Sequence, residues 1–129
     1  MARKKTSAQL DREIAASLAA PRQVTPTDTN IFALSELVLK AGGQSTISNR
    51  LERVDYPHIR RCLAGGLLTV SSPTTLTLTP AGREAVLQRL RRNYSSQNAA
   101  FTRVPERFDA KDRARLDQLR NAIAQLESS

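Results

Sequence analysis

A single cysteine, a single histidine and no tryptophan occur among the 129 residues. One cysteine excludes an intrachain disulfide, and one cysteine with one histidine excludes a zinc finger or a cysteine-rich metal site. Aromatic residues are 4% of the chain and hydrophobic residues 40%, so any core must be aliphatic. No apolar run reaches the length of a membrane span, and no signal-peptide apolar region follows the basic start. We therefore expect a cytoplasmic protein with no membrane partner.

Residues typical of a reaction centre are also missing. The sequence has no Gly-rich phosphate loop, no serine in a nucleophile elbow and no paired carboxylates beside His58. Cys62 follows four residues later, which makes a Cys–His pair conceivable. Cys62 falls, however, on the apolar stripe of its predicted helix with Ile59 and Leu63, so we expect a small core residue. We expect no enzyme activity, no cofactor and no metal.

Negative charge is scarce in the middle of the chain. The formal net charge is +8, and most of it lies on residues 31–93, which contain nine Lys/Arg and four Asp/Glu. Residues 1–30 contain five Lys/Arg and three Asp/Glu, and residues 94–129 contain six Lys/Arg and five Asp/Glu. The positive excess on the central segment suits neutralisation of phosphates and release of counterions from a nucleic acid. An arginine-rich proteome would give the same composition without such a role.

The order of elements predicted for residues 45–79 is helix, sharp turn, helix and two strands. Three apolar residues at helical spacing predict a short helix over residues 45–54; these are Ile47, Leu51 and Val54. A second helix is predicted over residues 55–64, with Asp55 as its N-cap and Pro57 in its first turn, where a missing N–H costs nothing.

Two further patterns fix the limits of this region. Val54 and Ile59 have the positions of a hydrophobic staple across the start of the second helix. Residues 67–71 and 75–78 alternate with period two, which predicts a β-hairpin, and Thr79-Pro80 would begin another helix.

A resemblance to winged-helix transcription regulators of the MarR and PadR kind is carried by Ala64-Gly65-Gly66-Leu67-Leu68 through Leu76-Thr77-Leu78-Thr79-Pro80-Ala81-Gly82-Arg83. In those proteins a recognition helix leads to a Gly-Leu-hydrophobic strand, and the second wing strand runs into Leu-Thr-x-x-Gly and the next helix. The resemblance covers residues 29–92, about half of the chain. It implies a winged helix-turn-helix fold, DNA binding and dimerisation through terminal helices.

The wing tip departs from that family. MarR-type wings carry an Asp-x-Arg element whose arginine enters the minor groove, whereas the tip here is Ser71-Ser72-Pro73-Thr74-Thr75, short and uncharged. It offers hydroxyl and backbone contacts to phosphate. Either the basic residues 3–5 replace the missing arginine, or minor-groove reading is absent.

The predicted fold class is mainly α with a small two-stranded β wing (α+β): a winged helix-turn-helix with extra N- and C-terminal helices. Residues 1–29 would be a basic arm, an amphipathic helix and a linker, and residues 30–93 the winged helix-turn-helix domain. Residues 94–129 would be a linker and an amphipathic C-terminal helix. That helix could dock on its own domain, but we favour a homodimer interface, because a twofold axis would bury both terminal helices. The interface residues would be Leu10, Ile14, Leu18, Leu116, Leu119, Ile123 and Leu126.

The outer face of the helix predicted over residues 55–64 is the candidate for base reading. At about 100° per residue, Arg61 points away from Ile59, with Arg60 and His58 at the two edges. Arginine bidentate to guanine is the commonest specific contact, so Arg61 comes first; a solvated surface is the alternative for the Arg60-Arg61 pair. Candidates for phosphate contacts are Ser45, Thr46, Asn49, Tyr56, Ser72, Thr74, Arg3, Lys4 and Lys5.

These features predict sequence-specific binding of double-stranded DNA by a homodimeric transcriptional regulator. One alternative is a winged-helix adaptor that binds protein in a nucleoprotein complex, with weak DNA affinity that disappears near physiological salt. Another is non-specific nucleic-acid binding, in which affinity follows charge and not sequence. No cluster of polar groups nominates a pocket for a small-molecule effector.

Overall fold

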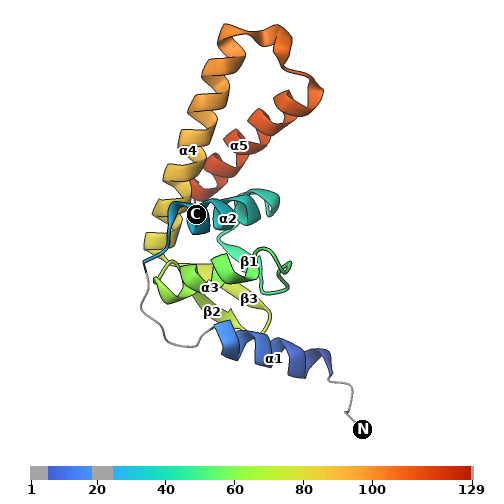
Figure 1. The fold of residues 1–129 in the computed structure, drawn as a ribbon, viewed down its shortest axis with the longest axis vertical. Coiled ribbons are helices and arrows are strands. Elements are labelled where there is room, and N and C mark those ends of the chain that lie inside the picture. Colours follow the sequence, from blue (N-terminus) through green and yellow to red (C-terminus); the bar gives the residue numbers. More distant parts are fainter. Residues whose placement is uncertain (1–5, 19–24, 129) are drawn as a thin grey trace.

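The computed structural model describes residues 6–18 and 25–128; residues 1–5, 19–24 and 129 lie outside the described part (Figure 1). It is mainly helical with one small antiparallel sheet, which confirms the predicted α+β class. Within the described ranges, no helix combines the length and apolar character that a membrane crossing needs. The elements are α1 (Ser7–Leu18), α2 (Asp28–Lys40), β1 (Thr46–Ser48), α3 (Tyr56–Ala64), β2 (Leu68–Ser72), β3 (Thr75–Leu78), α4 (Pro80–Arg103), the 3-10 helix η1 (Pro105–Arg107) and α5 (Ala110–Ser128).

The sheet has three strands in the order β1-β3-β2, so the last strand in sequence lies in the middle. β2 and β3 form an antiparallel hairpin with Leu68 opposite Leu78, as the alternation over residues 67–78 predicts. β1 pairs with the other edge of β3, with Ile47 opposite Leu76. These four side chains are buried and turn one face of the sheet toward the helices.

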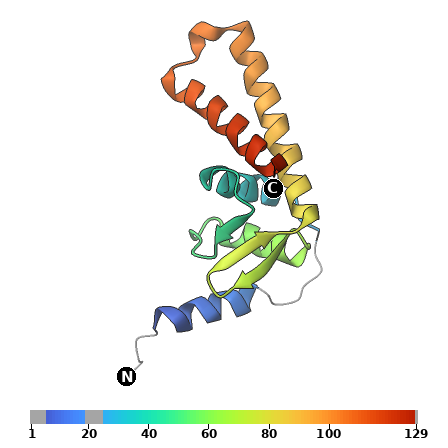
Figure 2. The ribbon, with the colours of Figure 1, turned by 180° about the vertical axis from the view of Figure 1, so that it is seen from behind.

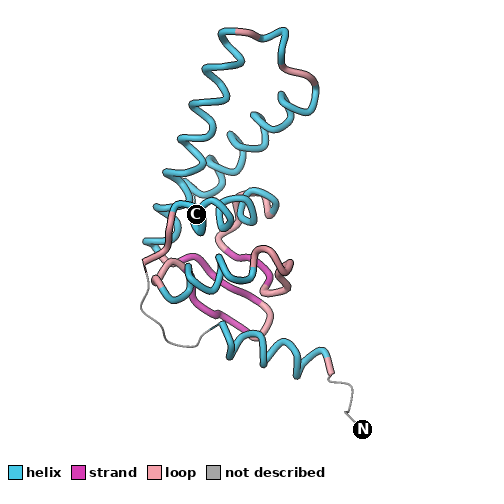
Figure 3. The backbone as a smooth tube through the Cα atoms, in the orientation of Figure 1, coloured by secondary structure: helices cyan, strands magenta, loops and turns pink. Residues whose placement is uncertain are grey.

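β1 lies where a short helix is predicted, so the helix expected over residues 45–54 is wrong and the expected two-stranded ribbon gains a third strand. Thr46–Ser48 alternates exposed, buried, exposed, as an edge strand does. A helix of this length is marginal alone, whereas the open edge of β3 offers hydrogen-bond partners to an extended segment. Residues 49–55 form a loop and one turn that lead into α3 (Figure 3).

α2 is the central helix of the body and begins with a capping box. The Thr27 hydroxyl oxygen accepts from the Asn30 backbone N–H at 3.2 Å, and Asn30 Oδ1 accepts from the Thr27 N–H at 2.8 Å. Thr27 is therefore the N-cap residue of α2. The inner face of α2 packs against α3, the sheet and α4 through Leu34, Val38 and Leu39.

α4 is one continuous helix of 24 residues, which corrects the prediction of a linker after residue 93. The predicted domain boundary at residues 93 and 94 therefore falls inside this helix. It begins at Thr79-Pro80 as predicted, and the Thr79 hydroxyl caps it by accepting from the Gly82 N–H at 3.0 Å. α4 and α5 run side by side and project from the body as a helical hairpin (Figures 1 and 2).

The apolar seam of α5 is buried within its own chain, against α4 and α2. Leu119 and Leu126 are fully buried, and Leu116 and Ala122 nearly so. A glycine permits the closest approach: Gly43 has a φ of +84°, and a Cβ atom there would lie 2.4 Å from the carbonyl oxygen of Ala122. No side chain other than hydrogen fits between the two backbones.

Arginine side chains fix both ends of α5. Near its C-terminus, Arg83 of α4 donates from Nε to the carbonyl oxygen of Leu126 at 2.8 Å and from a terminal nitrogen to that of Glu127 at 3.1 Å. These carbonyls have no partner inside the helix, so Arg83 acts as a C-cap. Nearer the N-terminus, Arg115 contacts both carboxylate oxygens of Glu36 at 2.6 and 3.3 Å.

The dimer interface expected on α5 is corrected by this packing. Leu116, Leu119 and Leu126 meet their own domain, which is the alternative that the periodicity left open, and Ile123 packs partly against the same core. Homodimerisation itself stays a prediction, without this seam to support it. On α1, Leu10 is exposed and Ile14 packs partly against the core, whereas the side chain of Leu18 lies outside the described ones.

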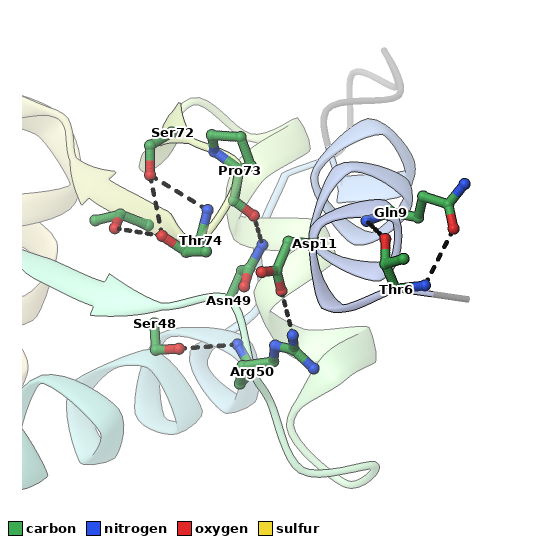
Figure 4. A network of polar contacts seen from close by, with 10 residues as sticks. Thr6, Gln9, Asp11, Ser48, Asn49, Arg50, Ser72, Pro73 and Thr74 are labelled. Carbon is green, nitrogen blue, oxygen red and sulfur yellow. Dashed lines mark hydrogen bonds and ion pairs between the residues drawn. The ribbon is translucent and has the colours of Figure 1, made fainter. Parts of the chain in front are cut away.

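α1 lies at the opposite end of the molecule from the α4–α5 hairpin, beside β2 and the tip of the β2–β3 turn (Figures 1 and 4). A capping box lies at its start: Thr6 and Gln9 exchange hydrogen bonds of 3.0 and 3.1 Å. Asp11 is buried and pairs with Arg50 at 2.6 Å. This ion pair joins α1 to the loop that follows β1.

Candidate nucleic-acid interface

The two faces of α3 differ sharply. Ile59 and Cys62 are 0% exposed and face the core, whereas Arg61 is exposed on the opposite side, as the helical wheel predicts. Pro57 lies in the first turn as expected and is also exposed, and Arg60 is half-buried at the edge. α3 thus has a fixed inner face and an outer face with a long cationic side chain.

His58, predicted as a base reader, is partly committed to the fold. Asn30 Nδ2 lies 2.8 Å from His58 Nδ1. Because Asn30 Oδ1 already accepts from Thr27, the amide orientation is fixed and Nδ2 is the donor to the ring. His58 therefore joins α3 to the N-terminus of α2, and only its other ring nitrogen remains for a ligand.

Cys62 is a core residue, as expected. Burial raises the pKa of its thiol from 9.0 to about 12, because the thiolate would be desolvated. Its Sγ donates to the carbonyl oxygen of Asn30 at 3.6 Å. Both His58 and Cys62 thus bond to Asn30. The capping role of Asn30 escaped the sequence prediction, although Thr27-x-x-Asn30 has the spacing of a capping box.

Three of the predicted phosphate contacts rest on the helix that the structure lacks. Ser45 precedes β1 and Thr46 begins it, so neither lies at a helix N-terminus. Asn49 is 1% exposed, and its Nδ2 donates to the carbonyl oxygen of Pro73 (Figure 4). Asn49 therefore anchors the β2–β3 turn from inside, which excludes it as a phosphate contact in this conformation.

The turn between β2 and β3 holds two further predicted contacts, and their hydroxyl groups bond within the turn. Ser72 Oγ accepts from the Thr74 N–H at 3.2 Å and lies 3.3 Å from Thr74 Oγ1 (Figure 4). Thr74 is exposed and Ser72 half-buried. Tyr56, another predicted phosphate contact, begins α3, and its ring packs partly on the core. The predicted contacts at Arg3, Lys4 and Lys5 lie outside the described residues.

Some arginines are paired within the described chain, and others, both near α3 and at Arg92, Arg103 and Arg107 of the α4–α5 region, make no ion pair with another described residue. Arg83, Arg91 and Arg115 are paired with groups of α5 or α2. By contrast, Arg53, Arg60 and Arg61 make no ion pair with any other described residue. Free guanidinium groups on one end of the body fit an anionic partner.

Val54 is the feature of this region that the sequence prediction missed. It is 71% exposed, so the predicted hydrophobic staple with buried Ile59 is wrong. Asp55 occupies the predicted N-cap position but makes no side-chain capping bond. The backbone of this turn is nevertheless helical, because the Tyr56 N–H bonds to the carbonyl oxygen of Glu52 at 3.1 Å.

Two hollows of the described surface lie away from the outer face of α3. A cavity of about 270 Å³ lies between α4 and α5, beside Tyr94, Phe101 and Arg113. Arg113 lies over the Phe101 ring at 5.8 Å, and that ring meets Phe108 edge to face at 5.1 Å. Another cavity, of about 230 Å³, lies beside Phe32 and Arg89. Within the described ranges, no three His, Cys, Asp or Glu side chains are grouped to hold a metal ion.

Comparisons with known proteins were made at three levels. No protein-family model, no curated protein and no solved structure matches this chain.

Proposed function

We propose that this chain binds double-stranded DNA in a sequence-specific way, as a winged-helix transcriptional regulator with α3 in the major groove. The observation that carries the proposal is the two-faced α3: Arg61 is exposed on a helix whose other face is fully buried. Because its inner face is buried in the core, the backbone of α3 has little freedom to move, and the Arg61 guanidinium group projects from a fixed position. Bidentate contact between arginine and guanine needs such a fixed approach.

The β2–β3 hairpin supports the same proposal, because it directly follows α3 in the position of a wing. Its tip is anchored by Asn49 and carries hydroxyl groups but no charge. In this proposal the tip meets phosphate through its backbone N–H groups and hydroxyls, and sequence reading is left to α3.

The fold differs from a standard helix-turn-helix in one respect. The element before α3 is a single turn that follows β1, not a helix. The turn is tied to the body by β1 and by the Arg50–Asp11 ion pair, so α3 is still positioned from its N-terminal side. Homodimerisation, which would place two recognition helices about 34 Å apart, is retained as a separate proposal. Sedimentation equilibrium over a hundredfold concentration range tests it.

Selection of binding sites from a random DNA library tests the proposed function. We expect enrichment of a short motif, and affinity for that motif that exceeds affinity for random duplex by about a thousandfold or more at physiological salt. Equal, steeply salt-dependent binding to all sequences would indicate non-specific binding instead. Loss of all DNA binding near physiological salt would favour the protein-adaptor function.

A further inference from the structure

Helical periodicity places Val54, Pro57 and Arg61 on one outer face of α3 and the turn before it, a line of residues within about 60° around the axis. The turn is helical through the Tyr56-to-Glu52 bond, and Asp55 has α-helical dihedral angles, φ −88° and ψ −26°. Seven residues at 3.6 per turn leave Val54 and Arg61 only about 20° apart around the axis. All three residues are exposed, Val54 at 71%. Two apolar side chains therefore precede the arginine on the face that we assign to the groove.

We propose that Val54, with Pro57 beside it, contacts the 5-methyl group of thymine in the DNA site. The inference rests on the proposed function and adds a specificity determinant to it. Single exposed apolar residues are common on proteins, so exposure alone would not carry the argument. Two further features support the proposal. Val54 is aligned with Arg61, and it lies at the N-terminal end of the helix, the end that contacts base edges in groove-binding helices.

The charged residues near Val54 favour DNA over an apolar protein as the partner that binds this surface. Near Val54 the chain carries Arg53, Arg60 and Arg61 against Glu52 and Asp55, so the formal charge of this segment is positive by one. The three arginines make no ion pair with other described residues. An apolar protein partner would leave these charges without a counterion in the interface, whereas the DNA backbone supplies phosphates. In the major groove, the thymine methyl is the apolar group among the base edges, and apolar side chains recognise it.

The spacing gives the position of the thymine. Seven residues at 1.5 Å rise place Val54 about 10 Å from Arg61 along the helix axis, and four residues place Pro57 about 6 Å away. At 3.4 Å per base step these distances correspond to about three and two base pairs. The recognised sequence therefore contains a thymine two or three base pairs from the guanine that Arg61 contacts.

The experiment uses the full chain and the selected site, with each thymine replaced in turn by deoxyuridine, which lacks only the methyl group. We expect about a fourfold loss of affinity at the thymine two or three pairs from the Arg61 guanine, and none at other thymines. Val54→Ala should lose affinity on the thymine site by a similar factor and should no longer respond to deoxyuridine. Circular dichroism of Val54→Ala checks that this exposed change leaves the fold intact.

Each outcome decides the inference. It is overturned if Val54→Ala keeps full affinity, if the variant stays as sensitive to deoxyuridine as the parent, or if the selected site has no thymine at that spacing. In those cases the specific site is still bound, so the proposed function stands. If the library yields no preferred site, the proposed function fails and this inference fails with it.

Discussion

Gly42 and Gly43 are adjacent glycines that differ in what surrounds them, and this difference tests how α5 is docked. Both have positive φ, +76° and +84°. A Cβ atom on Gly42 would meet nothing within 4 Å, whereas one on Gly43 would lie 2.4 Å from the carbonyl oxygen and 2.7 Å from the Cα atom of Ala122. Gly42→Ala therefore introduces backbone strain alone, and Gly43→Ala introduces strain and a collision with the backbone of α5.

The magnitudes follow from these two terms. A non-glycine residue in the left-handed region costs about 1–2 kcal/mol, so Gly42→Ala should lower the free energy of unfolding by that amount. Gly43→Ala adds overpacking against a backbone that cannot rotate away, about 1–3 kcal/mol more. We expect a total loss of about 2–5 kcal/mol, because α5 must shift away from α2 and expose part of its leucine seam.

Urea unfolding followed by circular dichroism measures both variants, with Gly42→Ala as the matched control. Limited proteolysis gives a second readout, because a displaced α5 should be cut by trypsin after Lys111, Arg113 or Arg120. Equal stability of the two variants, within about 0.5 kcal/mol, would refute the intrachain docking of α5. The expected homodimer interface through Leu119 and Leu126 would then have to be considered again.

Three further predictions concern the junction of α2 and α3 and the α5 contacts. Because the raised pKa of Cys62 favours the neutral thiol in the folded state, stability should be unaffected below pH 9.0 and should fall between pH 9.0 and about 12. By pH 10 the ionisation of Cys62 should have lowered the free energy of unfolding by about 1.4 kcal/mol. The measurement is the difference in unfolding free energy between the parent and Cys62→Ala, followed as the pH is raised. A difference that stays constant with pH would contradict the prediction. Asn30→Ala removes the capping box of α2 and the bond to His58, and should lower the free energy of unfolding by about 1–3 kcal/mol in thermal or urea unfolding. The control Gln9→Ala, at the exposed capping box of α1, should lower it by less than about 1 kcal/mol. Arg83→Met removes the C-cap of α5 and should lower the free energy of unfolding by about 1–2 kcal/mol. The control Arg92→Met, at an exposed position of α4, should lower it less. Equal losses for the two variants would argue against the capping role of Arg83.

The elements predicted well from sequence are those whose local pattern and tertiary contacts agree. In α3, the apolar stripe of Ile59 and Cys62 and the proline in the first turn mark both the helix and its buried face. The β2–β3 hairpin follows from alternation that continues over two strands. Ile47 misled the prediction because a three-residue strand contains too few positions to separate a period of two from a helical period.

The remaining errors arise from partners that a sequence does not name. Residues 93–103 are rich in serine, asparagine and threonine, and their only large apolar side chains are Tyr94 and Phe101, so their helix depends on continuation of α4 and on packing beside α5. The leucine spacing of α5 was interpreted correctly as amphipathic, but periodicity does not say whether the covering surface belongs to the same chain. Val54 fits a staple in sequence, yet the turn directs it to solvent.

The central claim is that Arg61 on the outer face of α3 reads a base, and one measurement tests it most directly. The affinities of the parent, Arg61→Ala and the control Arg103→Ala are compared on the selected site and on random duplex at one salt concentration. The account predicts that Arg61→Ala loses about 1–3 kcal/mol on the selected site and little on random DNA, whereas Arg103→Ala loses little on either. A loss for Arg61→Ala that is the same on both DNAs, or no loss at all, would contradict it.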